Sequence, residues 1–242
     1  MSRDSSDRVT GLFDACVRDL TPSSWRQSVQ VLYAPLSSDP QVTQACSSVL
    51  RDIELQRAGL FVKPGLRAQF IQRRAFRRYC GARALGVSPP LSQVSFDETE
   101  KGRPYLRDMP DAWFSFSSCR FGFAGAWTHA GGIGVDLEDI TREIETADLA
   151  GQFFSAAEAR VVASAGSRER QCFFHLWSLK EAALKSIGEG LPFGLDAFEF
   201  ELAPELNVIN APPGHGGPGR FSAHLRQGEE MCTALVIRDR SS

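Results

Sequence analysis

The chain lacks the features that mark secreted and membrane proteins. Its 242 residues include only six cysteines, with no CxxC pair and no zinc-ligand spacing: Cys16, Cys46, Cys80, Cys119, Cys172 and Cys232. No apolar run approaches the length that crosses a bilayer, and the N-terminal residues lack the apolar core of a signal peptide. We therefore expect a cytoplasmic globular protein that does not bind membranes and whose thiols are reduced and mostly buried.

Net charge is also small, at −2, with 27 basic and 29 acidic residues. This balance argues against a nucleic-acid-binding protein, and no RNA-type aromatic motif is present. The charge is nevertheless uneven. Residues 55–96 hold eight basic side chains and no acidic one, whereas residues 134–148 hold six acidic side chains against Arg142 alone. A basic segment and an acidic segment together suit a ligand that carries phosphates and is bound with a metal ion.

The acidic segment begins with a strand pattern. Val135 and Leu137 alternate with Asp136 and Glu138, and a period of two places both carboxylates on one face. Like charges this close repel each other unless something neutralises them. A solvated strand face is the alternative interpretation, but a bound cation accounts for the pair better.

A helix pattern follows in residues 170–187. Its apolar stripe consists of Leu176, Leu179, Ala183 and Ile187. An adjoining face carries three residues spaced four apart: Trp177, Glu181 and Lys185. Alternatively, Glu181 and Lys185 form only a surface ion pair, and Trp177 belongs to the core. If this face meets the acidic strand, three carboxylates and a lysine converge. Oxygen ligands with a nearby cation suit Mg²⁺ holding a phosphate-bearing substrate.

These motifs together resemble the 4′-phosphopantetheinyl transferases of the surfactin-synthetase-activating (Sfp) type. The matching segments are G-V-D-L-E at 134–138, F-x-x-x-E ending at Glu158, and W-S-x-K-E-A-x-x-K at 177–185. Further matches are K-G-R-P at 101–104 and F-S-F-S at 114–117, in the order of the family. The similarity spans approximately residues 29–238.

The resemblance implies an α+β fold of two similar lobes related by a pseudo-twofold axis, with the active site in the cleft between them. We expect a polar N-terminal extension over residues 1–25, an N-terminal lobe over 26–126 and a C-terminal lobe over 127–242. The implied enzyme transfers the 4′-phosphopantetheine group from coenzyme A to a serine of an acyl or peptidyl carrier protein. Two lobes in one chain favour a monomer.

The resemblance assigns metal binding to Asp136, Glu138 and Glu181 and catalysis to Glu181 and Lys185. A serine hydroxyl needs a base to become a nucleophile. Whether Glu181, Glu158 or a water on the metal takes the proton stays open, because Glu158 also completes a helix-capping box with Ser155.

Seven residues are expected to bind coenzyme A: Arg57, Arg74, Arg103, Ser117, Ser118, Lys180 and Lys185. The resemblance places phosphate contacts in the first half without mapping each residue, and Arg74 is included because it borders the apolar face of its helix. Lys180 could instead be a solvated helix lysine. Ser118 departs from the family, which has a histidine there that helps to bind the 3′-phosphate. A serine donates one hydrogen bond but carries no charge, so a weaker contact is expected. A catalytically degenerate homologue that binds coenzyme A or carriers without turnover is the alternative that this departure leaves open.

Hydrophobic periodicity also predicts the order of elements. We expect helices at 41–60, 66–85, 155–164 and 170–187 and strands at 29–34, 113–117, 121–127, 133–138, 198–202 and 231–237. On the arginine-rich helix, Arg67, Arg74 and Arg78 are expected beside the apolar face, whereas Arg73 and Arg77 are expected to point outward. Residues 210–220 are predicted to be a surface loop because of their glycine and proline content.

Overall fold

The computed structural model describes residues 3–86 and 89–239. In its first half, the helices are α1 (Arg3–Cys16), α2 (Pro40–Ser47), α3 (Asp52–Gly59) and α4 (Pro64–Leu85). The strands are β1 (Arg18–Asp19), β2 (Val29–Pro35), β3 (Phe96–Glu98), β4 (Pro104–Leu106), β5 (Trp113–Cys119) and β6 (Gly122–Thr128).

The second half begins after a tight connection from β6. Its helices are α5 (Thr146–Phe153), α6 (Ala156–Ser164) and α7 (Glu169–Ser186). Its strands are β7 (Gly131–Asp139), β8 (Glu199–Glu201), β9 (Asn207–Asn210), β10 (Phe221–Gln227) and β11 (Met231–Asp239). The predicted α+β class is confirmed.

The two halves repeat one connectivity. In the first half β2 leads into two short helices and the long α4, and the sheet is ordered β1-β2-β6-β5. In the second half β7 leads into two short helices and the long α7, and the sheet is ordered β10-β11-β7. The strand that leads into the helices, β2 in the first half and β7 in the second, therefore pairs antiparallel with the last strand of its half, β6 or β11.

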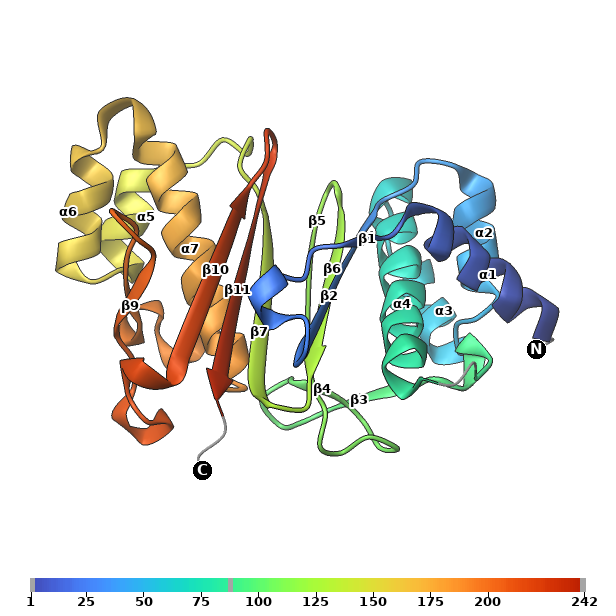
Figure 1. Ribbon diagram of the computed structural model, residues 1–242. Coiled ribbons are helices and arrows are strands. Elements are labelled where there is room, and N and C mark those ends of the chain that lie inside the picture. The colour runs from blue at the N-terminus through green and yellow to red at the C-terminus, as the bar shows by residue number, and fades with distance from the viewer. Residues whose placement is uncertain (1–2, 87–88, 240–242) are drawn as a thin grey trace.

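The sheets lie face to face between the two long helices, with α4 at one side and α7 at the other (Figure 1). Apolar side chains from both sheets form the central core between them, among them Val31, Ala126, Val135, Leu137 and Leu235. Each long helix covers the other face of its own sheet over a separate core. The alternation of β7 therefore turns Val135 and Leu137 toward the opposite sheet and leaves Asp136 and Glu138 on the side of α7.

Several boundaries differ from the prediction. The expected N-terminal extension includes the helix α1, which begins earlier than the short helix predicted at 11–19 and buries Val9 and Phe13 in the first core. The helix expected over 41–60 is two helices, since Glu54 accepts a hydrogen bond from the backbone of Arg51 and starts α3 anew. The pattern analysis missed α5, β3, β4, β9 and β10, and short 3₁₀ turns interrupt the 210–220 loop.

All six cysteines are free thiols, as expected from their spacing. None of the helices in residues 3–86 and 89–239 is both long enough and apolar enough to span a bilayer.

Candidate active site

Two glycines of β7 set the distance between this strand and α7. A Cβ on Gly134 would lie 1.7 Å from the carbonyl oxygen of Ala182, and one on Gly132 would lie 2.0 Å from that of Ser186. Any larger residue at either position would therefore push the helix away. This close packing brings the C-terminal part of α7 over the next residue of the same strand face, Asp136.

Asp136 lies at the centre of the site and is 3% exposed. Its Oδ1 accepts hydrogen bonds from Lys185 Nζ at 2.7 Å and from Ser117 Oγ at 2.8 Å. Lys185 Nζ also donates to the carbonyl of Val135 at 3.3 Å. The other carboxylate oxygen, Oδ2, is buried and has no hydrogen-bond partner among the described residues. One oxygen is thus held in place and the other is left for a ligand.

The neighbouring carboxylates carry more negative charge than the nearby bases neutralise. Burial, together with the Asp136 carboxylate, raises the pKa of Glu138 to about 7, although Arg142 lies 3.1 Å away. Burial and Asp136 also raise the pKa of Glu181, against the opposing effect of Lys185 at 3.9 Å. Burial alone would lower the pKa of Lys185, but Asp136 and Glu181 outweigh it and raise that pKa.

The structure brings together Asp136, Ser117, Glu181 and Lys185 and places Glu138 beside them. In the described part of the chain, no three His, Cys, Asp or Glu side chains converge closely enough to form a ready-made metal cage. Lys185 Nζ lies between two of the carboxylates, 2.7 Å from Asp136 Oδ1 and 3.9 Å from Glu181 Oε2.

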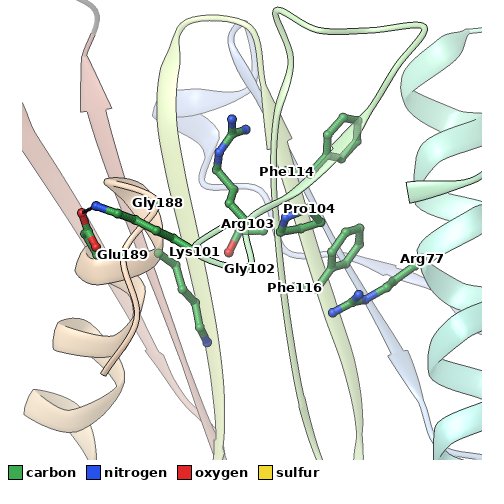
Figure 2. A pocket seen from close by; sticks show the side chains of 11 residues that line it. Arg77, Lys101, Gly102, Arg103, Pro104, Phe114, Phe116, Gly188 and Glu189 are labelled. Atoms are coloured by element: carbon green, nitrogen blue, oxygen red, sulfur yellow. Dashed lines mark hydrogen bonds and ion pairs between the residues drawn. The ribbon is translucent and has the colours of Figure 1, made fainter. Parts of the chain in front are cut away.

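A pocket with basic side chains opens beside Lys185 and takes residues from both halves (Figure 2). Its lining comprises Arg77, Lys101, Gly102, Arg103, Pro104, Phe114, Ser115, Phe116, Lys185, Gly188 and Glu189. Arg103 stacks on Trp113 at 4.1 Å, and burial lowers its pKa. Lys101 pairs with Glu189, so one ion pair among the lining residues joins the two halves. Four cations around one cavity suit a ligand with several phosphate groups.

The arginine-rich helix does not meet the prediction. Arg77, which was expected to point outward, lies 5.0 Å over the Phe116 ring and lines the pocket. Arg78, which was expected at the border of the apolar face, is buried and forms two hydrogen bonds with Glu54. The reason is the buried Glu54 carboxylate of α3, which draws this part of α4 inward.

The predicted coenzyme A residues Arg57 and Arg74 lie outside the pocket. They and Arg73 surround the Phe70 ring at 5.4 to 5.8 Å. Arg73 Nη1 lies 3.5 Å from Ser118 Oγ, so a permanent cation stands beside the serine that replaces the family's histidine. Arg73, Arg74 and Arg77 each have a buried Nε without a hydrogen-bond partner in the described residues.

Lys180 is not a coenzyme A ligand, which corrects the prediction. Its side chain is fully buried and lies 2.6 Å from Glu158. It also donates to the backbone carbonyls of Leu195 and Phe198, and burial lowers its pKa against the effect of Glu158. Lys180 therefore stabilises the second half from within.

Glu158 is committed to the same buried network. It completes the capping box with Ser155 and accepts a hydrogen bond from the backbone of Phe200 at 3.0 Å. With Lys180 beside it, no oxygen of this side chain reaches the site. The capping interpretation is confirmed, and Glu158 is removed from the candidate bases.

Sequence reasoning missed Arg77 and Glu189. Glu189 follows α7 directly, close to the W-S-x-K-E motif, but only the contact with Lys101 places it at the pocket. No sequence signal indicates that pairing.

Comparison with known proteins finds similarity to one enzyme family. A sequence model of the 4′-phosphopantetheinyl transferase superfamily matches residues 132–235. The 4′-phosphopantetheinyl transferase HetI of Nostoc sp. is 32% identical over 174 residues, which is 70% of this chain and 72% of the relative.

Two Bacillus proteins are similar over a shorter stretch. The 4′-phosphopantetheinyl transferase Sfp of Bacillus subtilis is 34% identical over 130 residues, or 51% of this chain and 55% of the relative. The 4′-phosphopantetheinyl transferase psf-1 of Bacillus pumilus is 34% identical over 130 residues, or 53% of this chain and 54% of the relative. The chain thus spans little more than half the length of these two relatives.

Proposed function

The chain belongs to the 4′-phosphopantetheinyl transferases, and we propose that it transfers the 4′-phosphopantetheine group of coenzyme A to a serine of an acyl or peptidyl carrier protein. Adenosine 3′,5′-bisphosphate is the second product. The observation that carries the proposal is Asp136, whose Oδ1 is fixed by Lys185 and Ser117 while its buried Oδ2 stays unpartnered among the described residues. This carboxylate borders a pocket lined by basic side chains.

The carboxylates fit Mg²⁺. A divalent cation would give Oδ2 of Asp136 a partner and would relieve the crowding that raises the pKa values of Glu138 and Glu181. Asp136, Glu138 and Glu181 would hold it, and all supply the oxygen ligands that Mg²⁺ prefers. When bound, Mg²⁺ neutralises charge on the pyrophosphate of the donor.

The basic residues of the pocket bind the donor. Arg103 is held by its stacking on Trp113 and keeps its guanidinium free for bidentate contact with phosphate. Arg77 and Lys101 line the same cavity, and Lys185 lies where it joins the carboxylates. Lys185 thereby contacts the pyrophosphate while it orients Asp136.

Glu181 takes the proton of the acceptor serine. Glu181 lies beside Lys185 and Asp136 on the site, whereas Glu158 is committed elsewhere. The serine oxygen forms a bond to the phosphorus of the 4′-phosphopantetheine group, and the bond from that phosphorus to the bridging oxygen of the pyrophosphate breaks. The electron pair leaves with adenosine 3′,5′-bisphosphate, whose new charge Lys185 and Arg103 offset.

Mass spectrometry of apo-carrier proteins tests the proposal. Each carrier is incubated with the protein, coenzyme A and Mg²⁺, and with the chelator EDTA as the control. We expect a mass gain of one phosphopantetheine group at the carrier serine, which EDTA abolishes. Tight binding of coenzyme A without any mass gain, over acyl and peptidyl carriers alike, would mean that the chain is a binding homologue without turnover.

A further inference from the structure

The glycine- and proline-rich loop at 210–220 forms part of a second polar cavity. The cavity encloses about 270 Å³, against about 120 Å³ for the basic pocket. Its lining consists of three glycines and four polar residues: Gly131, Gly214, Gly216, His215, Arg220, Arg238 and Asp239. It lies where β7 begins and β11 ends, at the end of the second sheet (Figure 1). None of these residues lines the basic pocket, so the two spaces are separate.

Arg238 is held in this cavity by two neighbours. Its Nη1 donates a hydrogen bond to His215 Nδ1 at 2.8 Å, and its guanidinium lies 5.8 Å from the centre of the Trp113 ring. Arginine has only donors, so Nδ1 of His215 is the accepting nitrogen and the hydrogen of the neutral ring is on Nε2. His215 therefore presents its remaining ring nitrogen as a donor.

Arg220 is the second cation that is held in place. Its Nη2 donates a hydrogen bond to the backbone carbonyl of Asp239, the last residue of β11. Its stem packs against Gly216, where a Cβ would lie 2.7 Å from Arg220 Cγ. Gly216 also has a φ of +95°, so glycine is the residue that fits this turn. The loop thus positions Arg220 before any ligand binds.

No carboxylate neutralises either guanidinium. Within residues 3–86 and 89–239, neither Arg220 nor Arg238 forms an ion pair, whereas Arg78 and Arg120 each have one. Asp239 contacts Arg220 through its backbone oxygen alone. Burial and the charge of Arg220 lower the pKa of Arg238. Two cations that repel each other across a cavity are stabilised by an anion between them.

The nearest acid on the side of the basic pocket is already paired. Burial and Arg238 lower the pKa of His215, against a smaller opposing effect of Glu189. Glu189 itself forms an ion pair with Lys101. His215 is therefore neutral near pH 7. The arginines supply the positive charge of the cavity, and the imidazole supplies a hydrogen bond.

We propose that this cavity is an anion site that binds a phosphate group, separate from the pocket that holds the donor. Two guanidiniums and an imidazole N–H can donate to several oxygens of one phosphate, a geometry for which arginine is well suited. The glycines of the lining let the ligand approach the backbone closely. The occupant is inorganic phosphate or the phosphate of a nucleotide. The inference goes beyond the proposed transferase function and does not depend on it.

Two substitutions remove the site, each with a matched control. A Cβ at Gly214 would meet no atom within 4 Å, so a side chain fits there. Gly214→Glu brings a carboxylate to the cavity, and Gly214→Gln adds the same shape without the charge. Arg220→Gln removes one cation from the cavity, and Arg77→Gln removes one from the basic pocket. Melting curves establish that each variant is folded.

Nuclear magnetic resonance of the His215 ring gives the readout. The chain has four histidines, and His215→Gln identifies the signal. Sodium phosphate is titrated at one fixed pH, with sodium chloride at matched ionic strength as the reference. We expect a saturable shift with phosphate and none with chloride. The Kd should rise by about tenfold in Arg220→Gln and Gly214→Glu and stay within about twofold of wild type in Arg77→Gln and Gly214→Gln.

Two results would overturn the site. Equal shifts with chloride and phosphate would show that salt merely screens the arginines. A response that is lost in Arg77→Gln and kept in Arg220→Gln would place the phosphate in the basic pocket. Neither result bears on group transfer, which is measured on carrier proteins.

A second titration distinguishes the two sources of phosphate. Adenosine 3′,5′-bisphosphate is added to Arg77→Gln, in which the basic pocket is weakened. A lower Kd than that of inorganic phosphate, raised again in the double variant Arg77→Gln/Arg220→Gln, would support a nucleotide as the occupant. An equal or higher Kd would support the free ion.

Discussion

The two halves of the molecule contain the same kind of buried ion pair, but the charge that surrounds the pair has the opposite sign in each half. In each half a short helix begins with a glutamate in a capping box, and that glutamate pairs with a base on the long helix. The first half pairs Glu54 with Arg78 at 2.6 Å, and the second pairs Glu158 with Lys180 at 2.6 Å. Both glutamates are largely buried and both hydrogen-bond to the residue three positions earlier.

The surroundings of the two pairs differ in charge. Lys180 has three oxygen acceptors, so the second pair is neutral and complete. Glu54 is shared between Arg78 and Arg74, and Arg73 and Arg77 stand nearby, so the first half retains excess positive charge. The second half retains excess negative charge at Asp136. The same connectivity thus carries a group of arginines in the first half, here called the cationic wall, and the carboxylates around Asp136 in the second half, here called the anionic wall. The two walls meet at the pocket.

Removing the centre of the anionic wall should have the largest effect. Asp136→Ala removes the carboxylate that Lys185 and Ser117 orient, and a metal ligand supplies several kcal/mol at the developing charge. We expect the rate of transfer to fall by roughly a thousandfold or more. Glu138→Ala should follow the same direction. Carrier modification assays at saturating Mg²⁺ measure both, with circular dichroism as the check of folding. Near-native turnover would contradict the metal assignment.

Breaking each of the two buried ion pairs in turn should lower the free energy of unfolding by different amounts. Lys180→Met leaves Glu158 buried without a counter-charge, a change that costs about 3–5 kcal/mol. Arg78→Met should cost less, because Arg74 remains 3.8 Å from Glu54. Urea unfolding monitored by fluorescence compares the two variants with wild type.

The double variant Lys180→Met/Glu158→Gln is the control for that experiment. Removing both charges should recover a large part of the stability lost in Lys180→Met. If Lys180→Met proves no less stable than Arg78→Met, the loss of the counter-charge of Glu158 costs no more stability than the loss of Arg78 beside Glu54. A variant that keeps its fold but loses coenzyme A affinity alone would restore Lys180 to the donor site.

Local patterns predicted the anionic wall better than the cationic wall. The alternation around Asp136 and the four-residue spacing of Glu181 and Lys185 are properties of one strand and one helix, so a short stretch of sequence contains them. The inward turn of Arg77 and the burial of Lys180 depend on partners from other elements, namely Glu98 and Glu158. No pattern within a single helix could indicate either pairing.

The fold shows the same division. The long helices α4 and α7 and the strands β2, β5, β6 and β7 carry clear periodicity and lie close to their predicted positions. The break between α2 and α3 depends instead on the Glu54 side chain, and the edge strand β10 is half-exposed with a weak alternating pattern. Elements with little apolar burial therefore left the least trace in the sequence.

Lys185 and Glu181 lie where the two walls meet, and substitutions of these residues should affect coenzyme A affinity and the rate of transfer differently. Lys185→Ala removes a cation that faces both Asp136 and the pocket, so coenzyme A affinity and rate should both fall, affinity by about tenfold. Glu181→Gln keeps the shape but cannot accept a proton, so kcat should fall with a smaller change in affinity. Calorimetry with coenzyme A and steady-state kinetics separate the two. Unchanged coenzyme A affinity in Lys185→Ala would limit that lysine to orienting carboxylates.

Acid should weaken the first half through Glu54. Burial would raise the pKa of this carboxyl, but Arg78, the Arg51 backbone and Arg74 outweigh it and lower the pKa below the ordinary glutamate value of 4.5. A lowered pKa means that the contribution is complete above pH 4.5 and is lost as the pH falls through the lower folded-state pKa. In Glu54→Gln this acid-dependent loss should be absent. Urea unfolding between pH 6 and 3, with wild type as the reference, measures it, and identical pH slopes would contradict the assignment.

Ser118→His should have the smallest effect, and it tests whether the cationic wall already replaces the family's histidine. Arg73 stands 3.5 Å from Ser118 and stays charged at every working pH, so wild type should prefer coenzyme A over 3′-dephospho-coenzyme A equally at pH 6 and pH 8. A histidine at position 118 titrates between these values and should strengthen the preference by a few-fold at pH 6 only. The apparent KM of both donors at both pH values gives the answer, with Arg73→Gln as the matched variant that should lose the preference. If Arg73→Gln still rejects the dephospho donor as strongly as wild type, another cation holds the 3′-phosphate, and the charge excess of the first half serves a different purpose.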